Sequence, residues 1–307
     1  MPPRLSVVVI SYNMARELPR TIRSLSLSMQ KGVAAEDYEV IVVDNGSTDV
    51  FPEAECRRWI PDLVVHHIAD PRPSPVAAVN MGIELARAEL VGVCIDGARM
   101  ASPGLLASAM AASRLHDRPV IGALAFHLGP DLQRRSMRNG YNQTVEDDLL
   151  AQCGWEADGY RLFDVSAFAG SSAKGWFILP NETNSLFLAK DHWEQLGGLD
   201  QGFESPGGGL ANLDVWSRAC SDPEGQVVML LGEATFHQLH GGIATNSQHP
   251  PKALFKDEYQ RLRGRPFSMP DAEIWFFGRV HPHALRSMGR SIELRLEAET
   301  AASAKVI

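Results

Sequence analysis

The sequence predicts an α/β fold, in which a mixed, mostly parallel central sheet is flanked by helices. Short apolar runs rich in β-branched residues recur along the first hundred residues, and segments with helical spacing follow them. Alternation of this kind produces βαβ units, whose strands lie parallel and are buried on both faces. Asp44, Asp70 and Asp96 each stand at the end of one of these runs. Because parallel strands end at the same edge of a sheet, where ligands bind, the three carboxylates are expected to converge there.

Four strands and two helices are expected in this first part of the chain. The strands are residues 5–10 (LSVVVI), 38–44 (YEVIVVD), 63–69 (LVVHHIA) and 90–96 (LVGVCID). A first helix follows from apolar residues at helical spacing, Leu18, Ile22, Leu25 and Met29, and a second helix covers residues 75–88. The turn-rich segment NGSTD comes directly after Asp44.

The second half of the chain is less regular. Residues 130–165 are polar and aromatic with weak periodicity, which predicts an irregular excursion over the site. Further elements are then expected in this order: a strand at 185–189, a helix at 190–197, a glycine-rich loop at 207–209, a helix beginning at NLDVWSRAC and a strand at 227–237. The chain therefore divides into a main domain, residues 1–245, and a C-terminal helical extension, residues 246–307. In that extension Leu285, Met288, Ile292 and Leu294 indicate a final amphipathic helix.

Composition narrows the class of protein. The 307 residues carry a formal net charge of −8, and the sequence pI near 5.7 argues against a nucleic-acid-binding face. The cysteines, Cys56, Cys94, Cys153 and Cys220, lack metal-site spacing and are expected to be thiols in a reducing compartment. No apolar segment is long enough to span a membrane, and a cytoplasmic location is expected.

Four motifs carry a resemblance to a known family. The segments LSVVVISYN, EVIVVDNGSTD, VNMGIELARAELVGVCIDG, and GGLD followed by a GGG loop occur in order over residues 4–245. In this arrangement the chain resembles a GT-A glycosyltransferase of the large family 2. Residues 182–218 also resemble polypeptide N-acetylgalactosaminyltransferases, and EATFHQ resembles the strand-end histidine of those proteins and of bacterial chondroitin-type polymerases.

The resemblance implies a GT-A, Rossmann-like fold and a transferase activity. A sugar would move from a nucleotide-diphosphate sugar, first of all a UDP-sugar, to a hydroxyl acceptor in glycan or polysaccharide assembly. The acceptor would be a glycan, a lipid-linked molecule or a small molecule. Residues 1–128 would form the nucleotide-binding half of the main domain, and residues 129–245 the acceptor-side half.

The donor site follows from the same resemblance. Asp44 would accept hydrogen bonds from the base and favour uracil, although an Asp at this place also caps the NGST turn. The residues implied in donor binding are Ser11, Tyr12, Asn13, Asp44, Asp70, Arg72, Asn80, Asp96, Gly97 and Arg99.

A divalent metal, Mn²⁺ or Mg²⁺, is expected at the fourth strand end, because it stabilises the charge that develops on the diphosphate. Asp96 is the expected ligand, and a histidine is expected to add another: the resemblance favours His237, with His240 as the second choice. Family 2 enzymes usually carry DxD here, whereas this chain reads Asp96-Gly97-Ala98 and lacks the second acid. Arg99 is the alternative, because a guanidinium group can neutralise a diphosphate directly.

The catalytic base is the second departure from the family pattern. The acidic pair of inverting relatives falls on Ala211 and Asn212, neither of which can accept a proton. The remaining acidic candidates are Asp214, Glu182 and Glu204. One of them acts as the base, or the mechanism is retaining and needs no such base, or the chain binds sugars without transferring them.

Two other classes of function are alternatives to the transferase. The first is a catalytically weak nucleotide-sugar-binding or scaffold domain of a glycan-assembly complex. The second is a sugar-phosphate nucleotidyltransferase, which residues 10–24 disfavour because they lack a glycine-rich, arginine-bearing phosphate loop. The tail helix is expected to pack on the core, with a homodimer as the alternative.

Overall fold

The computed structural model describes residues 2–242 and 251–303, so the domain boundary expected at 245/246 lies outside the described residues. The strands are β1 (Leu5–Ser11), β2 (Tyr38–Asp44), β3 (Val64–His67), β4 (Leu90–Cys94), β5 (Arg99–Ala101), β6 (Pro119–Leu128), β7 (Ser166–Phe168), β8 (Ser185–Ala189), β9 (Gln226–His237) and β10 (Ile274–Gly278). The α-helices are α1 (Leu18–Ser24), α2 (Glu53–Trp59), α3 (Val76–Leu85), α4 (Leu105–Ala112), α5 (Gln133–Arg138), α6 (Gln143–Cys153), α7 (Lys190–Leu196), α8 (Ala211–Cys220), α9 (Lys252–Arg263) and α10 (Leu285–Ser303).

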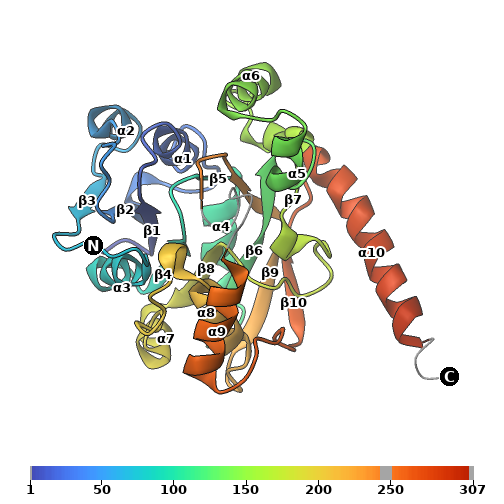
Figure 1. Cartoon of the computed structure of the whole chain (residues 1–307). Helices are drawn as coiled ribbons and strands as arrows, with labels where there is room; N and C mark the ends of the chain where they lie inside the picture. The colour runs from blue at the N-terminus through green and yellow to red at the C-terminus, as the bar shows by residue number, and fades with distance from the viewer. Residues whose placement is uncertain (1, 243–250, 304–307) are drawn as a thin grey trace.

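The strands form one mixed central sheet with helices on both faces, which confirms the predicted fold class (Figure 1). The strand order is β10-β9-β6-β8-β4-β1-β2-β3, with β5 added to β9 and β7 added to β6. The pairs β1–β2, β1–β4, β2–β3, β6–β9 and β9–β10 are parallel, whereas β8 runs antiparallel to both β4 and β6. The carboxyl ends of β1, β2, β4, β6 and β9 therefore share one edge, beside the amino end of β8.

Alternate side chains of the central strands enter two separate cores. In β1, Val8 and Ile10 join one buried cluster, whereas Val7 and Val9 join the cluster on the opposite face. All four side chains are almost fully buried. This double burial explains why the strand reads as a continuous apolar run rather than an alternating one.

Helix α3 packs unusually close to β1 because it contains Gly82. A Cβ atom at this position would lie 2.2 Å from Cγ1 of Val8. Nearby, the amide of Asn80 both accepts from the Leu199 N–H at 2.9 Å and donates to the Leu199 carbonyl at 2.8 Å. These contacts hold α3 against the GGLD turn, under the edge of the sheet that carries the strand ends.

The region 130–165 is more regular than its sequence predicted. It contains α5, α6 and a 3₁₀ helix at Gly159–Val165. The Asn142 side chain accepts from the Val145 N–H and so begins α6, and Gly154, in the left-handed conformation, ends it. The weak periodicity of the sequence reflects short elements, each of which buries only a few residues.

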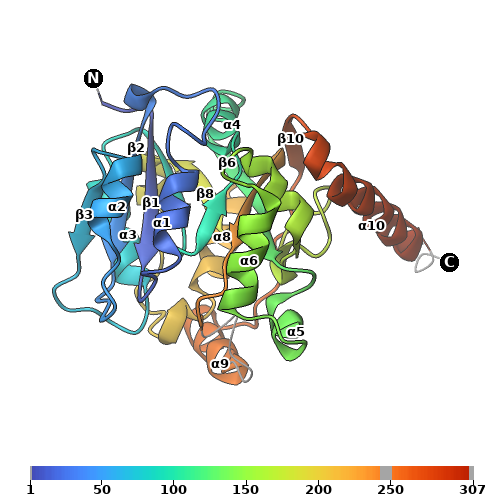
Figure 2. The same cartoon turned by 90° about the horizontal axis from the view of Figure 1, so that it is seen from above.

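The C-terminal extension is not solely helical, because β10 joins the central sheet beside β9. Helix α10 packs on the body through its first half, where Met288 and Ser291 are buried and the Ser291 hydroxyl accepts from the Trp176 N–H. Its second half extends away from the body, with Leu296 exposed (Figure 2). In the described part of the chain, no helix is long and apolar enough to cross a bilayer.

Candidate functional site

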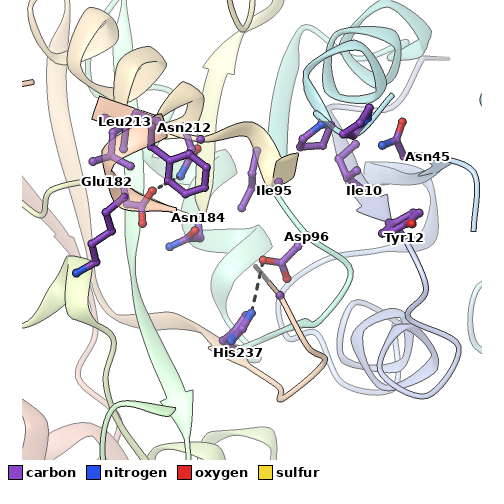
Figure 3. Close-up of a pocket in the computed structure, with 18 of the residues that line it drawn as sticks. Ile10, Tyr12, Asn45, Ile95, Asp96, Glu182, Asn184, Asn212, Leu213 and His237 are labelled. Atoms are coloured by element: carbon purple, nitrogen blue, oxygen red, sulfur yellow. Dashed lines mark hydrogen bonds and ion pairs between the residues drawn. The ribbon is translucent and has the colours of Figure 1, made fainter. Parts of the chain in front are cut away.

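A pocket of about 940 Å³ opens at the edge where the parallel strands end. Its walls come from the loops after β1, β2, β3, β4 and β9, the segment before β8, the glycine loop before α8, and α9. Tyr12 and Asn45 lie at one end, Asp96 and His237 in the middle, and Glu182 with Asn212 at the other end (Figure 3). Of the residues predicted from the sequence, those that line the pocket are Tyr12, Asn13, Asp96, Arg99, Glu182, His237 and His240.

The loops after β1 and β2 are joined through Asn13. Its side-chain oxygen accepts from the N–H groups of Thr48 and Asp49, at 2.8 and 3.1 Å, and its own N–H donates to the Ser47 hydroxyl at 2.8 Å. Asn13 has a φ of 50°, a left-handed conformation that Asn tolerates better than most residues. The link leaves the Tyr12 ring 54% exposed at the mouth of the pocket, where an aromatic base can stack on it.

Asp44 is buried and engaged by its own loop. Its carboxylate accepts from the Ser47 hydroxyl and lies 3.2 Å from Nδ1 of His67. It does not line the pocket, and this geometry is that of the turn-capping alternative. The next residue, Asn45, does line the pocket: its Nδ2 donates to the Arg72 carbonyl at 2.9 Å, and its buried Oδ1 has no partner among the described residues.

Several expected donor residues lie outside the pocket lining. Asp70 and Arg72 are exposed on the loop after β3, and Asn80 is occupied by its bonds to Leu199. Ser11 is fully buried at the end of β1. Gly97 packs against α1, where its carbonyl accepts from the Thr21 hydroxyl at 2.7 Å.

The strand expected at 90–96 ends at Cys94, so Asp96 belongs to the loop rather than to the strand.

Asp96, His237 and His240 form a cluster whose ligand atoms all lie within 4.8 Å of one another. Nε2 of His237 lies 3.7 Å from Oδ2 of Asp96 and 3.1 Å from Nε2 of His240. Asp96 lies in the loop after β4, and His237 and His240 lie at and just beyond the end of β9. They meet because β5, which begins three residues after Asp96, pairs with β9.

The protonation of His237 is fixed by Gln133. Nε2 of Gln133 donates to the His237 carbonyl at 2.8 Å. The side-chain oxygen of Gln133 therefore faces Nδ1 of His237 at 2.7 Å and accepts a hydrogen bond from the N–H at that nitrogen. Nε2 is then the unprotonated nitrogen and presents its lone pair to the cluster. Burial, reinforced by the charge of Arg99, holds the pKa of His237 well below its usual value. Burial also lowers the pKa of His240, so both imidazoles are neutral near pH 7.

These residues fit a divalent cation. One carboxylate oxygen and two neutral imidazole nitrogens lie within 4.8 Å of one another, and a hydrogen bond orients one of the imidazoles. A divalent cation is thus indicated, and nitrogen ligands favour Mn²⁺ over Mg²⁺.

The three acidic candidates for the catalytic base lie in different surroundings. Glu182 lines the pocket half-buried, and its Oε2 accepts from the Asn212 amide at 2.8 Å. Burial raises the pKa of Glu182, which makes it a stronger base. Asp214 instead lies buried in the first turn of α8, with both oxygens held by Arg263 and one also by Arg218. Glu204 is exposed outside the pocket lining.

Sequence reasoning missed part of the pocket. Asn45 was overlooked although it stands beside Asp44 in the same motif. Helix α9 was missed because the tail looked unpatterned, yet Phe255, Tyr259 and Leu262 follow helical spacing. Residues 130–165, which were expected to cover the site, contribute nothing to the lining; the residues that α9 contributes are Lys252, Phe255, Lys256, Asp257 and Gln260.

Comparison with solved structures supports the fold. S. aureus TarS gives a TM-score of 0.52 at 14% identity, covering 88% of this chain and 44% of that one. The structure of S. aureus TarS 1–349 in complex with UDP-GlcNAc gives 0.52 at 15% identity, covering 85% of this chain and 67% of that one.

Comparison with characterised sequences gives a family. Validoxylamine A glucosyltransferases from two strains of Streptomyces hygroscopicus, subsp. jinggangensis and subsp. limoneus, are each 34% identical over 222 residues, or 67% of this chain. The chain spans about half the length of these curated relatives, 49% and 46%. The model of the family described as glycosyl transferase family 2 matches residues 6–168. Because this match covers just over half of the chain, the protein belongs to glycosyltransferase family 2.

Proposed function

We propose that this protein transfers a sugar from a nucleoside-diphosphate sugar, a UDP-sugar in the first place, to a hydroxyl group of an acceptor. The observation that carries the proposal is the order of groups along the pocket (Figure 3). An exposed aromatic ring and a buried amide suit a nucleoside, a cation-binding cluster suits a diphosphate, and a half-buried carboxylate follows where an acceptor would approach.

Glu182 is the proposed base. It would take the proton of the acceptor hydroxyl while the hydroxyl oxygen bonds to the anomeric carbon. The bond from that carbon to the diphosphate oxygen breaks, and its electron pair leaves with the diphosphate through an oxocarbenium-like transition state. A divalent cation held by Asp96, His237 and His240 would supply Lewis-acid stabilisation of the leaving charge.

Asn212 orients the proposed base. Its amide donates to Glu182 at 2.8 Å and to the Thr183 carbonyl at 3.0 Å, so one carboxylate oxygen is held in place. The acid that inverting relatives carry on the helix is thus replaced by an acid on the neighbouring segment before β8. Inversion of the anomeric carbon follows from this assignment, because the base lies across the pocket from the diphosphate region.

For the acceptor, we propose only a chemical class. Lys252, Lys256, Asp257 and Gln260 of α9 line the pocket, which favours a polar acceptor. The similarity to validoxylamine A glucosyltransferases makes a small aminocyclitol the first acceptor to test, before glycan and lipid-linked acceptors. A cytoplasmic location is proposed with this function, because nucleotide sugars would be its donors.

The test is a panel of UDP-, GDP- and dTDP-sugars with Mn²⁺, with UDP-glucose and validoxylamine A as one arm. Release of nucleotide and transfer of sugar are measured. Turnover with UDP-sugars is expected, and NMR of the product should show the inverted anomer. A retained anomer would support the resemblance of residues 182–218 to polypeptide N-acetylgalactosaminyltransferases and contradict Glu182 as base.

The alternative is a donor-binding scaffold, which the missing second carboxylate and the Asn at position 212 favour. Tight binding of UDP-sugar without turnover on any acceptor would select that alternative. Absence of any nucleotide binding would contradict both functions.

A further inference from the structure

Arg99 is a buried cation beside the Asp96–His237–His240 cluster. It begins β5, and the antiparallel pairing of β5 with β9 sets Arg99 directly opposite His237. The side chain is only 7% exposed, it lines the pocket, and its Nε donates to Oδ2 of Asp96 at 2.9 Å.

One nitrogen of the guanidinium group lacks a partner. Nη1 of Arg99 is buried and makes no hydrogen bond to any residue in the described part of the chain. Buried polar groups in folded proteins are almost always hydrogen-bonded, so a buried, unpaired donor in a pocket wall points to an acceptor on the ligand. Guanidinium groups bind phosphate oxygens with particular strength because both charge and geometry match.

Both oxygens of the Asp96 carboxylate already accept hydrogen bonds. Its Oδ1 accepts from the Ala98 N–H at 3.1 Å, and its Oδ2 is held by Arg99. Oδ2 is also the oxygen that faces Nε2 of His237. A divalent cation at the cluster would therefore have to share one oxygen with a guanidinium group, and the two positive charges would repel each other.

We propose that Arg99 binds the diphosphate of the donor directly through its guanidinium group, so that nucleoside diphosphates bind even when no divalent cation is present, and that its hold on Asp96 weakens cation binding. This inference deepens the proposed function and rests on it. The position after Ala98 thus carries a fixed positive charge in place of a second metal-binding acid.

The first experiment is calorimetry with UDP, inorganic pyrophosphate and uridine in the presence of a chelator. The unmodified protein should bind UDP and pyrophosphate. Arg99→Gln should weaken both by about 10- to 100-fold, the range expected for one charge-assisted hydrogen bond. Uridine carries no phosphate, so its affinity should be the same in the two proteins.

Two further variants separate charge from geometry. Arg99→Lys keeps the charge but loses the planar fork, and should weaken UDP binding by a smaller factor than Arg99→Gln. Arg87→Gln removes an arginine that is 67% exposed, pairs with Glu39 and lies outside the pocket lining, and should leave UDP binding unchanged.

The second experiment measures Mn²⁺ binding by electron paramagnetic resonance without nucleotide. Arg99→Gln frees Oδ2 of Asp96 and removes a repelling charge, so its Mn²⁺ affinity should rise by about threefold or more. A purely structural role for Arg99 predicts no such gain. Circular dichroism confirms that each variant is folded, and if Arg99→Gln is not, Arg99→Lys and the unmodified protein carry the test.

The outcomes distinguish this inference from the proposed function. UDP binding in chelator that Arg99→Gln leaves intact overturns the inference alone. The same holds if the unmodified protein binds UDP with Mn²⁺ but not in chelator. Failure to bind any nucleoside diphosphate under either condition overturns the proposed function and the inference together.

Discussion

Asn45 places a buried amide oxygen at the nucleoside end of the pocket. Because its Nδ2 is committed to the Arg72 carbonyl, Oδ1 is turned away from that bond and stays without a partner among the described residues. An unpaired acceptor is complementary to the N3–H donor of uracil and not to the N3 acceptor of cytosine. We therefore expect Asn45, rather than Asp44, to select the base, because the carboxylate of Asp44 is used within its own loop.

Replacement of Asn45 by Ala should therefore reduce the preference for uracil. We expect UDP binding to weaken by about 5- to 30-fold, the effect of one hydrogen bond to a buried acceptor, and CDP binding to change much less. Competition between UDP and CDP against a labelled nucleotide measures the ratio. An unchanged ratio in Asn45→Ala would mean that another residue selects the base.

Glu182 is the residue on which turnover should depend most. We expect Glu182→Gln to lower kcat by about 10²- to 10⁴-fold, because Gln keeps the hydrogen bond to Asn212 but cannot accept a proton. The KM for the donor should change little, since the residue lies at the other end of the pocket. Glu204→Gln is the matched control and should retain kcat; if both variants keep full activity, the base is not among these acids.

At the scale of elements, α6 holds two loops of the site together. Its Glu146 is fully buried and accepts from the Leu239 N–H at 3.0 Å and from Arg16 at 3.2 Å. Arg16 belongs to the loop after β1, whereas Leu239 lies between His237 and His240. Burial raises the pKa of Glu146, although Arg16 and the Leu239 N–H oppose the shift.

We expect Glu146→Gln to destabilise the fold and to loosen the cation site. The amide loses the negative charge that pairs with Arg16 and sets a donor beside the Leu239 N–H, which costs about 1–3 kcal/mol in the free energy of unfolding. Mn²⁺ affinity should fall, because Glu146 holds Leu239 in place and the proposed ligand His240 is the next residue. Asp147→Asn is the control: Asp147 is 44% exposed, pairs with Arg16 and Arg20, and should cost less than about 1 kcal/mol. Equal effects of the two variants would contradict a specific clamp.

For the whole molecule, stability should depend on pH through buried histidines. His127 in β6 accepts from the Gln133 N–H at 3.1 Å, and burial lowers the pKa of His127 to about 4. The unfolded chain takes up this proton near pH 6.5, so it binds more protons than the folded chain between about pH 6.5 and 4. The free energy of unfolding therefore falls as the pH falls through this window, by about 3 kcal/mol for this group.

His127→Asn keeps an acceptor near the position of Nδ1 but does not titrate. Urea unfolding at pH 7 and pH 4.5 should show that the variant loses about 2 kcal/mol less stability than the unmodified protein. Above about pH 7.5 His127 is almost entirely neutral in both the folded and the unfolded chain, so the free energies of unfolding of the two proteins should change in parallel there. An equal loss in both proteins at pH 4.5 would mean that His127 is not the group responsible.

The central strands could be predicted because their burial on both faces leaves a direct signature, as in the runs 38–44 and 185–189, which the structure reproduces. The positions of Asp96 and His237 at the sheet edge follow from parallel topology in the same way. Helix α9 and strand β10 could not be predicted with the same ease. They bury only one side or a few residues, and their sequences are mostly polar or short.

The sequence by itself determined the α/β class, the family motifs and the loss of the second acid after Asp96. Only the tertiary structure decided that Glu182, rather than Asp214 or Glu204, faces the pocket, and that Arg99 lies beside His237. The apolar pattern of a buried strand is a local property, because burial requires apolar side chains at neighbouring positions of the sequence. The direction of a loop side chain depends on contacts such as Glu182–Asn212 and on the pairing of β5 with β9, which join residues far apart in the chain.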